Sequence, residues 1–251
     1  AMSDLLKTQH DNGVLELSLN RPDKKNALTL AMYGALVDAL ESAAADEHVR
    51  VVLLRGEGDS FSAGNDLADF LVAAQKPEDM KIILKYLHTL VDFPKPLVAA
   101  AQGNAVGIGT TMLLHCDRVL VADNLKAQMP FVKLGLVPEG GTSLLLPLTL
   151  GHRLAFELVV EGALIDADRA CSLGIANEAV PNEKLREQAL TVAENVAKLP
   201  SEAVRQSKAM LKKVQRAQLH EVIDEEGLLF SQRLSSDEAR TALMSFLQKR
   251  T

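Results

Sequence analysis

The chain has 251 residues, of which 47% are hydrophobic and 24% are charged, and its formal net charge is −6. This composition excludes a disordered protein and predicts one large α/β domain, or one domain with an appended subdomain. The acidic balance argues against non-specific binding to nucleic acid or to an anionic membrane surface.

The low cysteine content and the lack of long apolar runs indicate the cellular compartment of the protein. Cys116 and Cys171 are too few for a disulfide framework, and they lack the spacing of a metal site. The first residues show neither the apolar run of a secretory signal nor an Arg-rich transit pattern, and no later apolar run approaches membrane-spanning length. We therefore expect a cytoplasmic protein in a reducing environment, without a membrane partner.

The first part of the chain alternates predicted strands with a helix. Val14 to Leu19 has the period-two pattern of a strand, and Asn20 to Leu28 carries turn residues. Thr29 can cap a helix that has one continuous apolar face. That face is formed by Leu30, Tyr33, Val37, Leu40 and Ala44. Arg50 to Leu54 then has the pattern of a short buried strand.

The middle of the chain continues this rhythm. Apolar residues at helical spacing predict a helix from Glu78 to Val91. Buried strands are predicted over Leu97 to Ala101 and Arg118 to Ala122, with a helix from Thr110 to His115 between them. Strands that alternate with helices favour an α/β layered architecture.

The last third of the chain changes in character. Asp166 can cap a helix that Gly174 ends. Three helices are predicted beyond it, over Ser201 to Ala217, Leu219 to Leu234 and Ser235 to Lys249. Ser235 and Glu238 have the spacing of a capping box at the start of the last helix.

Two glycine-rich loops each follow a predicted buried strand. In FSAGNDL (Phe61 to Leu67), Gly64 lets the backbone of Asn65 approach a ligand closely with its N–H exposed. GNAVGIGTT (Gly103 to Thr111) opens a helix, so its N–H groups also point toward the strand end. Two separated N–H donors can form an oxyanion hole, which stabilises the enolate made when a proton leaves the carbon next to a thioester carbonyl. Either loop alone could equally serve only a tight strand-to-helix crossing.

Several sequence blocks in a fixed order make the chain resemble the crotonase superfamily of enoyl-CoA hydratases and isomerases. The blocks are NRPDKKNAL, FSAGNDL, QGNAVGIG, CDRVLVAD, LGLVPEGGTSLLLP and the segment from Glu161 to Pro181, which together span nearly the whole chain. The resemblance implies the α/β crotonase (ClpP/crotonase-like) fold: a spiral of ββα units over residues 1–195, followed by a C-terminal helical trimerisation region over residues 196–251. It also implies an acyl-CoA thioester substrate and a homotrimer or dimer of trimers.

The resemblance assigns the oxyanion hole to the backbone N–H groups of Asn65 and Ile108. Ile108 stands where the family often has glycine, and its side chain is expected to narrow the acyl pocket. Coenzyme A is expected to contact Ala63, Asn65, Asp66, Leu67, Ala68 and Ile108. Asp66 could equally cap a helix.

Other coenzyme A contacts are expected outside that loop. Lys25 is expected near the ligand entrance, although a solvated turn explains it equally well. Phe246 and Lys249 have the Phe-x-x-Lys spacing that, in the family, contacts coenzyme A from the last helix, sometimes across a subunit boundary.

The candidate base is a single glutamate. Where a typical hydratase carries its two glutamates, this chain has Thr111 and Phe131, and neither can act as a carboxylate base. Glu139, in a Pro-Glu-Gly arrangement, matches the catalytic glutamate of peroxisomal-type and related bacterial 3-enoyl-CoA isomerases. We expect it at a helix N-terminus, which would lower its pKa, among apolar residues that would raise it. It could also serve only as a helix cap.

These observations predict an enoyl-CoA isomerase of fatty-acid β-oxidation that converts a 3-enoyl-CoA into a trans-2-enoyl-CoA through Glu139. No metal is expected, since His88 and His152 lack partners at metal-ligand spacing, and the isomerisation needs no redox cofactor. His115 and Cys116 are expected to be core residues. The alternatives are a hydratase or another crotonase-type acyl-CoA reaction, and a non-catalytic acyl-CoA-binding or scaffold protein.

Overall fold

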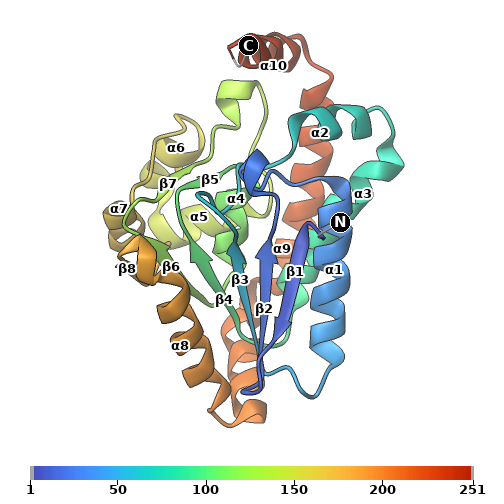
Figure 1. The fold of residues 1–251 in the computed structure, drawn as a ribbon. Helices are drawn as coiled ribbons and strands as arrows, with labels where there is room; N and C mark the ends of the chain where they lie inside the picture. The colour runs from blue at the N-terminus through green and yellow to red at the C-terminus, as the bar shows by residue number, and fades with distance from the viewer. Residues whose placement is uncertain (1–2, 250–251) are drawn as a thin grey trace.

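A six-stranded sheet runs through the centre of the computed structural model, which describes residues 3–249 and leaves residues 1–2 and 250–251 outside (Figure 1). In sheet order the strands are β1 (Leu5–Gln9), β2 (Val14–Leu19), β3 (Val51–Gly56), β4 (Leu97–Ala101), β6 (Arg118–Ala122) and β8 (Glu178–Val180). β1 is antiparallel to β2, and every other neighbouring pair is parallel. The carboxyl ends of β2, β3, β4 and β6 therefore lie at one edge.

The strand predictions are confirmed for β2, β3, β4 and β6, within one or two residues. Alternation along each strand divides its side chains between two buried faces. In β3, Val52 and Leu54 join one apolar cluster, whereas Val51 and Leu53 join the other. Such fully buried strands are expected in a parallel sheet that is covered by helices on both sides.

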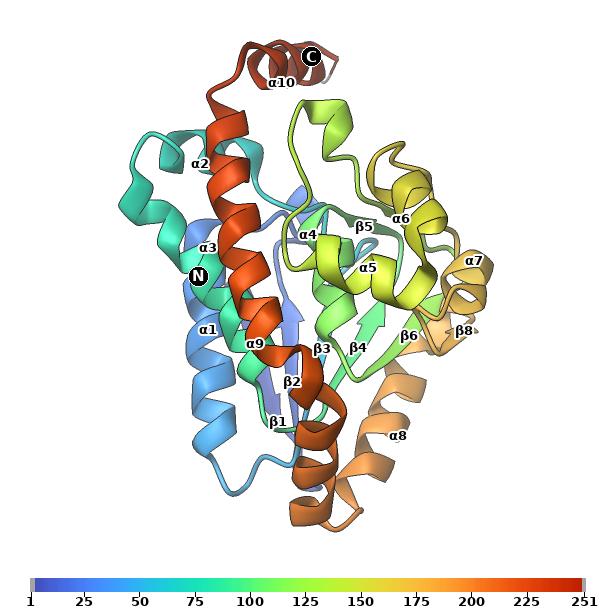
Figure 2. The same ribbon diagram turned by 180° about the vertical axis from the view of Figure 1, so that it is seen from behind.

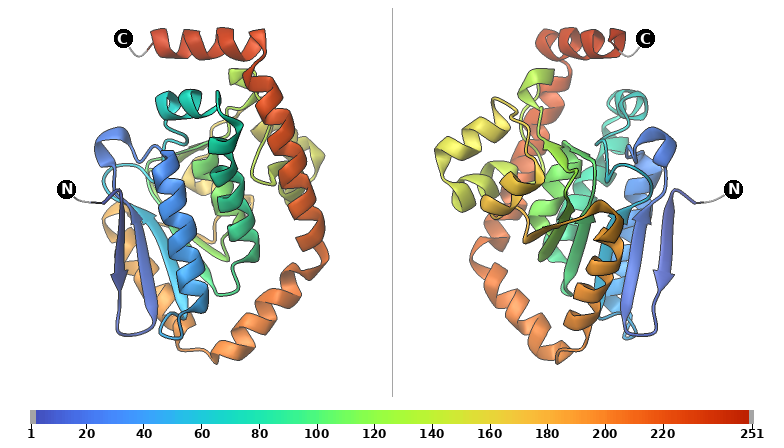
Figure 3. Two further views of the ribbon diagram at one scale, coloured as in Figure 1. Left: turned by 90° about the vertical axis from the view of Figure 1, so that its right-hand side faces the viewer. Right: turned by 60° about the vertical axis from the view of Figure 1, so that its left-hand side comes forward.

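Helices cover both faces of the sheet (Figures 2 and 3). On one face lie α1 (Leu30–Ala45) and α3 (Pro77–Asp92), and α9 (Ser201–Leu234) packs against α3 from outside. On the other face lies α8 (Leu185–Ala197). The predicted cap of α1 is confirmed, because the Thr29 hydroxyl accepts a hydrogen bond from the Met32 N–H. The chain beyond Pro181 was expected to be helical, but α8 was not delimited, since its buried positions are mostly small alanines that give a weak apolar pattern.

Two predictions about the C-terminal helices are wrong. Ser201 to Leu234 is one continuous helix rather than two, because no glycine, proline or cap interrupts it between residues 217 and 219. Ser236 rather than Ser235 caps α10 (Asp237–Gln248), accepting a hydrogen bond from the Ala239 N–H at 3.1 Å. Ser235 has the helical backbone that ends α9, whereas Ser236 has the extended backbone that an N-cap requires. The predicted boundary between the core (residues 1–195) and the C-terminal helical region (residues 196–251) falls inside the last turn of α8. This boundary stays a prediction.

Shorter elements complete the fold. They are β5 (Asn104–Val106) and β7 (Lys126–Gln128), which form a two-stranded sheet, α2 (Leu67–Ala73), α4 (Ile108–Thr111), α5 (Thr142–Leu150), α6 (His152–Val159), α7 (Ala167–Ser172), and the 3-10 helices η1 (Pro22–Lys24), η2 (Met112–His115), η3 (Val132–Leu134) and η4 (Asn182–Lys184). The predicted cap of α7 by Asp166 is confirmed. Within residues 3–249, none of the helices is both long enough and apolar enough to cross a membrane.

Candidate active site

The two glycine-rich loops pair with each other at the carboxyl edge of the sheet. The Ser62 N–H donates to the Asn104 carbonyl at 3.1 Å, and the Val106 N–H donates to the Ser62 carbonyl at 3.0 Å. Gly64 has φ of +91°, and a side chain there would place its Cβ 2.7 Å from the Val106 carbonyl oxygen. Only glycine permits this approach, so the pairing brings the segment of Asn65 next to the start of α4.

The two candidate donors are the backbone N–H groups of Asn65 and Ile108, and neither donates a hydrogen bond within residues 3–249. Around Asn65, the Gly64 carbonyl and the Asp66 N–H bond to Leu28, which leaves the Asn65 N–H without an acceptor among residues 3–249. Ile108 is the first residue of α4, and its N–H likewise has no acceptor in the described structure. Both groups therefore have the freedom that oxyanion-hole donors need.

Tyr33 fixes the side chain of Asn65. It lies on α1, is fully buried, and donates its hydroxyl hydrogen to the Asn65 side-chain oxygen. Burial, together with the nearby charge of Glu139, raises the pKa of Tyr33 well above its ordinary value, so the phenol stays protonated as a donor. Its role was not predicted, because the apolar face of α1 accounted for Tyr33 as a core residue.

Glu139 faces Thr111 across the site. Its carboxylate oxygen accepts a hydrogen bond from the Thr111 hydroxyl at 2.7 Å. The residue is partly exposed, but protein surrounds its carboxyl group, and this burial raises the pKa of Glu139 to about 8. The Thr111 hydrogen bond opposes the rise, and the charge of Glu226 adds to it. The carboxyl is thus a stronger base than an ordinary glutamate.

The expected place of Glu139 at a helix N-terminus is wrong. Gly140 and Gly141 follow it with φ of +72° and +81°, and this left-handed turn delays the start of α5 to Thr142. The N-terminus of α5 is occupied instead by the buried carboxylate of Glu226, which accepts hydrogen bonds from the Gly141 and Ser143 N–H groups. The lowering of the Glu139 pKa expected from a helix N-terminus is therefore absent, whereas the rise expected from burial is present.

The candidate coenzyme A residues cluster around the first loop. Ala63, Asn65, Asp66, Leu67 and Ala68 lie along it or in the first turn of α2, and the exposed Lys25 is joined to it because the Ala63 N–H donates to the Lys25 carbonyl. Asp66 does cap a helix, accepting from the Asp69 N–H, and it forms an ion pair with Arg21 at 2.9 Å. Its contact with coenzyme A stays a prediction.

Phe246 lies in the last turn of α10 and Lys249 directly follows this helix, which packs on η3 and on α9 (Figure 2). α10 comes close to the end of η3 at Gly135, where an added Cβ would lie 2.7 Å from the backbone of Ala239. The contact of Phe246 and Lys249 with coenzyme A rests on the resemblance and stays a prediction.

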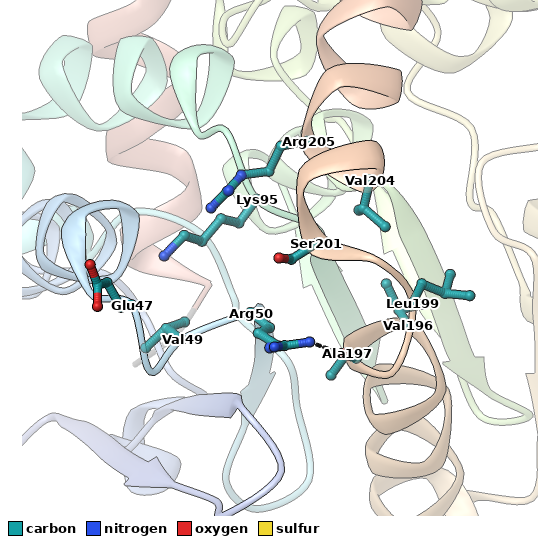
Figure 4. Close-up of a pocket in the computed structure, with 10 residues that line it drawn as sticks. All are labelled: Glu47, Val49, Arg50, Lys95, Val196, Ala197, Leu199, Ser201, Val204 and Arg205. Carbon is teal, nitrogen blue, oxygen red and sulfur yellow. Dashed lines mark hydrogen bonds between the residues drawn. The ribbon is translucent and has the colours of Figure 1, made fainter.

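A cavity at the opposite end of the sheet is unrelated to this chemistry. It lies where Arg50 precedes β3 and Lys95 precedes β4, and its volume is about 70 Å³ (Figure 4). The Lys95 ammonium donates to the Ala43 and Asp46 carbonyls, Arg205 pairs with Glu202, and Arg50 donates to the Ala197 carbonyl. Its cations are already partnered, and its volume is well below the roughly 300 Å³ of a usual ligand pocket.

The spiral α/β fold and the paired loops define this as a crotonase-fold protein. The chain belongs to the enoyl-CoA hydratase/isomerase family, whose model matches residues 9–251, and this family acts on acyl-CoA thioesters. It is 33% identical to enoyl-CoA delta isomerase 2 of Homo sapiens, over 99% of this chain and 64% of that protein, so it spans just under two thirds of that relative's length. It is 32% identical to 2,3-dehydroadipyl-CoA hydratase of Escherichia coli, over 100% of this chain and 98% of that protein.

Solved structures agree with this assignment of the fold. The structure of OdaA from Pseudomonas aeruginosa superposes with a TM-score of 0.93 at 44% identity, covering 98% of this chain and 99% of the other. The enoyl-CoA hydratase/isomerase from Pseudoalteromonas atlantica also gives 0.93, at 37% identity, covering 99% and 98%. The predicted crotonase fold is confirmed.

Proposed function

We propose that this protein is an enoyl-CoA isomerase that converts a 3-enoyl-CoA into a trans-2-enoyl-CoA, in fatty-acid β-oxidation. The observation that carries the proposal is the carboxyl of Glu139, which faces the Thr111 hydroxyl and has its pKa raised to about 8 by burial. The unused N–H groups of Asn65 and Ile108, on paired loops, supply the matching oxyanion hole.

The proposed steps move one proton and one double bond. The Glu139 carboxylate takes a proton from C2 of the substrate, and the electron pair of the broken C–H bond moves to the thioester carbonyl oxygen. The Asn65 and Ile108 N–H groups donate to the oxyanion of the resulting dienolate. The electron pair of the C3–C4 double bond then takes the proton back from the Glu139 carboxylic acid at C4, the oxyanion re-forms the thioester carbonyl, and the double bond lies between C2 and C3. The steps balance with no metal or redox group.

The raised pKa suits this task. The C2 proton of a thioester is a weak acid, so a base with a pKa near 8 removes it more readily than one near 4.5. Only the ionised carboxyl can start the reaction, and we therefore expect kcat/KM to rise with pH up to about 8 and then level off.

Hydration of a 2-enoyl-CoA is the second candidate, because the Escherichia coli relative is named as a hydratase. Hydration is best served by two carboxyl groups, one to activate water and one to manage the proton delivered to carbon. The nearby Glu226 is engaged through both oxygens by Gly141 and Ser143, so it does not offer a second free carboxyl. A non-catalytic acyl-CoA-binding or scaffold protein is the third candidate, and the raised pKa of Glu139 disfavours it.

The test compares two substrates. We expect the native protein to convert 3-hexenoyl-CoA into 2-hexenoyl-CoA and to hydrate crotonyl-CoA slowly or not at all. Glu139→Gln should abolish isomerisation, while Glu187→Gln, an exposed change on α8, should leave it unchanged. Efficient hydration without isomerisation would move the function to the hydratases, and binding of acyl-CoA without turnover would favour a scaffold protein.

We also propose a homotrimer or dimer of trimers. α9 exposes Met210, Leu211 and Val214 by 75%, 87% and 92%, and a second copy covering them would bury this apolar surface. Light scattering after gel filtration tests this, and a monomeric mass would contradict it. The cytoplasm remains the proposed location, supported by two free cysteines, although one relative is named as peroxisomal.

A further inference from the structure

One peptide group beside Glu139 is held at both ends by buried side chains. His115 Nε2 lies 2.6 Å from the Gly140 carbonyl oxygen, and Glu226 Oε1 lies 2.6 Å from the Gly141 backbone nitrogen. That oxygen and that nitrogen belong to the same peptide group. His115 comes from η2 and is 2% exposed, whereas Glu226 comes from α9 and is 6% exposed. Two distant segments thus meet on the turn that follows the candidate base.

His115 and Glu226, the two residues that hold this peptide group, differ in their chemistry. Burial lowers the pKa of His115 to about 4, so its ring is neutral at physiological pH and donates one N–H to the carbonyl. Glu226 accepts from the Gly141 N–H, from the Ser143 N–H at 2.9 Å and from the Ser143 hydroxyl at 2.6 Å. Burial raises the pKa of Glu226, and these donors oppose the rise because they stabilise the ionised carboxylate.

The contacts of His115 and Glu226 clamp the Gly140–Gly141 peptide, and without this clamp the turn could change its conformation. Gly140 and Gly141 are consecutive left-handed glycines, and a peptide between two such residues can turn over with little steric resistance. In the clamped orientation the peptide meets a donor at its oxygen and an acceptor at its nitrogen. Turning it over would direct the Gly140 carbonyl oxygen at the Glu226 carboxylate, and the two negative groups would repel each other. A side chain at Gly141 would be strained by the φ of +81°, and its Cβ would lie 2.5 Å from the end of the Leu219 side chain, which would have to shift.

We propose that His115 and Glu226 are positioning residues that lock the Gly140–Gly141 peptide and thereby hold the Glu139 carboxyl against Thr111 during proton transfer. Glu226 has a second effect, because its negative charge opposes ionisation of Glu139 and so strengthens the base. This inference rests on the proposed role of Glu139 as the base. The buried phenols of Tyr33 and Tyr86 also face Glu139, and burial together with the charge of Glu139 raises the pKa of both. The Lys212 ammonium donates to the His115 carbonyl at 3.2 Å.

Glu226→Gln tests the clamp with little change of shape. The Gln amide cannot accept from all three donors, so we expect kcat for 3-hexenoyl-CoA to fall about 10- to 100-fold, with KM within about twofold, as for a misplaced catalytic group. The acid limb of the pH profile should also move below 8, because the charge that raises the pKa of Glu139 is removed. Glu225→Gln, an exposed change one residue away, should alter neither. A uniform loss at every pH, without movement of the acid limb, would overturn the electrostatic part.

His115 provides a second pair of variants if Glu226→Gln does not fold. His115→Gln keeps a side-chain N–H that can reach the Gly140 carbonyl, whereas His115→Leu removes the donor at similar size. We expect His115→Gln to retain at least about tenfold more kcat than His115→Leu, the equivalent of one hydrogen bond to a buried carbonyl. Equal rates for the two variants would overturn the clamp.

An infrared pH titration of the protonated carboxyl band separates this inference from the proposed reaction. The band that is absent in Glu139→Gln belongs to Glu139, and its midpoint should fall in Glu226→Gln. If the midpoint falls but the native protein does not isomerise 3-hexenoyl-CoA, the proposed function fails while the electrostatic link survives. If isomerisation is observed but the midpoint stays fixed, the link from Glu226 to Glu139 is refuted.

Discussion

Replacing Glu139 by glutamine should stabilise the folded protein while it removes the base. Burial raises the pKa of Glu139 to about 8, against 4.5 for an ordinary glutamate. Between these two values the unfolded chain has lost a proton that the folded protein still holds, so stability falls as pH rises through this window. Glutamine can accept the same hydrogen bond from Thr111 and never ionises. At about 1.4 kcal/mol for each pH unit, the penalty removed is roughly 3 kcal/mol at pH 7 and at most about 5 kcal/mol at pH 9.

Urea denaturation of the native protein and Glu139→Gln at pH 5, 7 and 9 measures this effect. The gain should be below about 1 kcal/mol at pH 5, where both folded side chains are neutral, and should grow at each higher pH. Glu187→Gln on the exposed side of α8 provides the control and should show no such trend. A gain that is the same at all three pH values, or no gain at pH 9, would refute the raised pKa.

Three further substitutions test the site. Thr111→Val removes the hydrogen bond that lowers the pKa of Glu139, so the acid limb of kcat/KM should move above about 8; a limb that stays in place would contradict this. Tyr33→Phe removes the donor to the Asn65 side chain and should lower kcat about tenfold, with unchanged circular dichroism; an unchanged kcat would show that Asn65 needs no support. Ile108→Pro deletes one oxyanion donor at a helix position that tolerates proline, and steady-state kinetics should show kcat lower by about 100- to 1,000-fold; a native rate would exclude Ile108 from the hole.

The loops of the candidate site could be predicted because their chemistry is local. Gly64 and its neighbours follow a strand and precede a helix, and a glycine there already indicates a close backbone approach. Glu139 stood out because its Pro-Glu-Gly arrangement resembles that of the catalytic glutamate in related isomerases. The capped helix α1 and the apolar face of α3 were also predictable.

The supports of the site could not be predicted, because each depends on packing between distant segments. Glu226 reaches Gly141 across 85 residues of sequence, and on α9 it looks like one more acidic residue of a solvated helix. Tyr33 and His115 look like core residues, which they also are. Thr111 was recognised only as the absence of a glutamate, whereas the fold makes it the hydrogen-bond donor to Glu139.

The central claim is that one carboxyl carries the proton from C2 to C4. The most direct test uses 3-hexenoyl-CoA that is dideuterated at C2, with mass spectrometry of the product formed in ordinary water during the first turnovers. Because the Glu139 carboxyl is surrounded by protein, we expect part of the deuterium removed from C2 to be found at C4 of the product. A product with no deuterium at C4 would mean that solvent or a second group supplies that proton, and would contradict transfer by Glu139 alone.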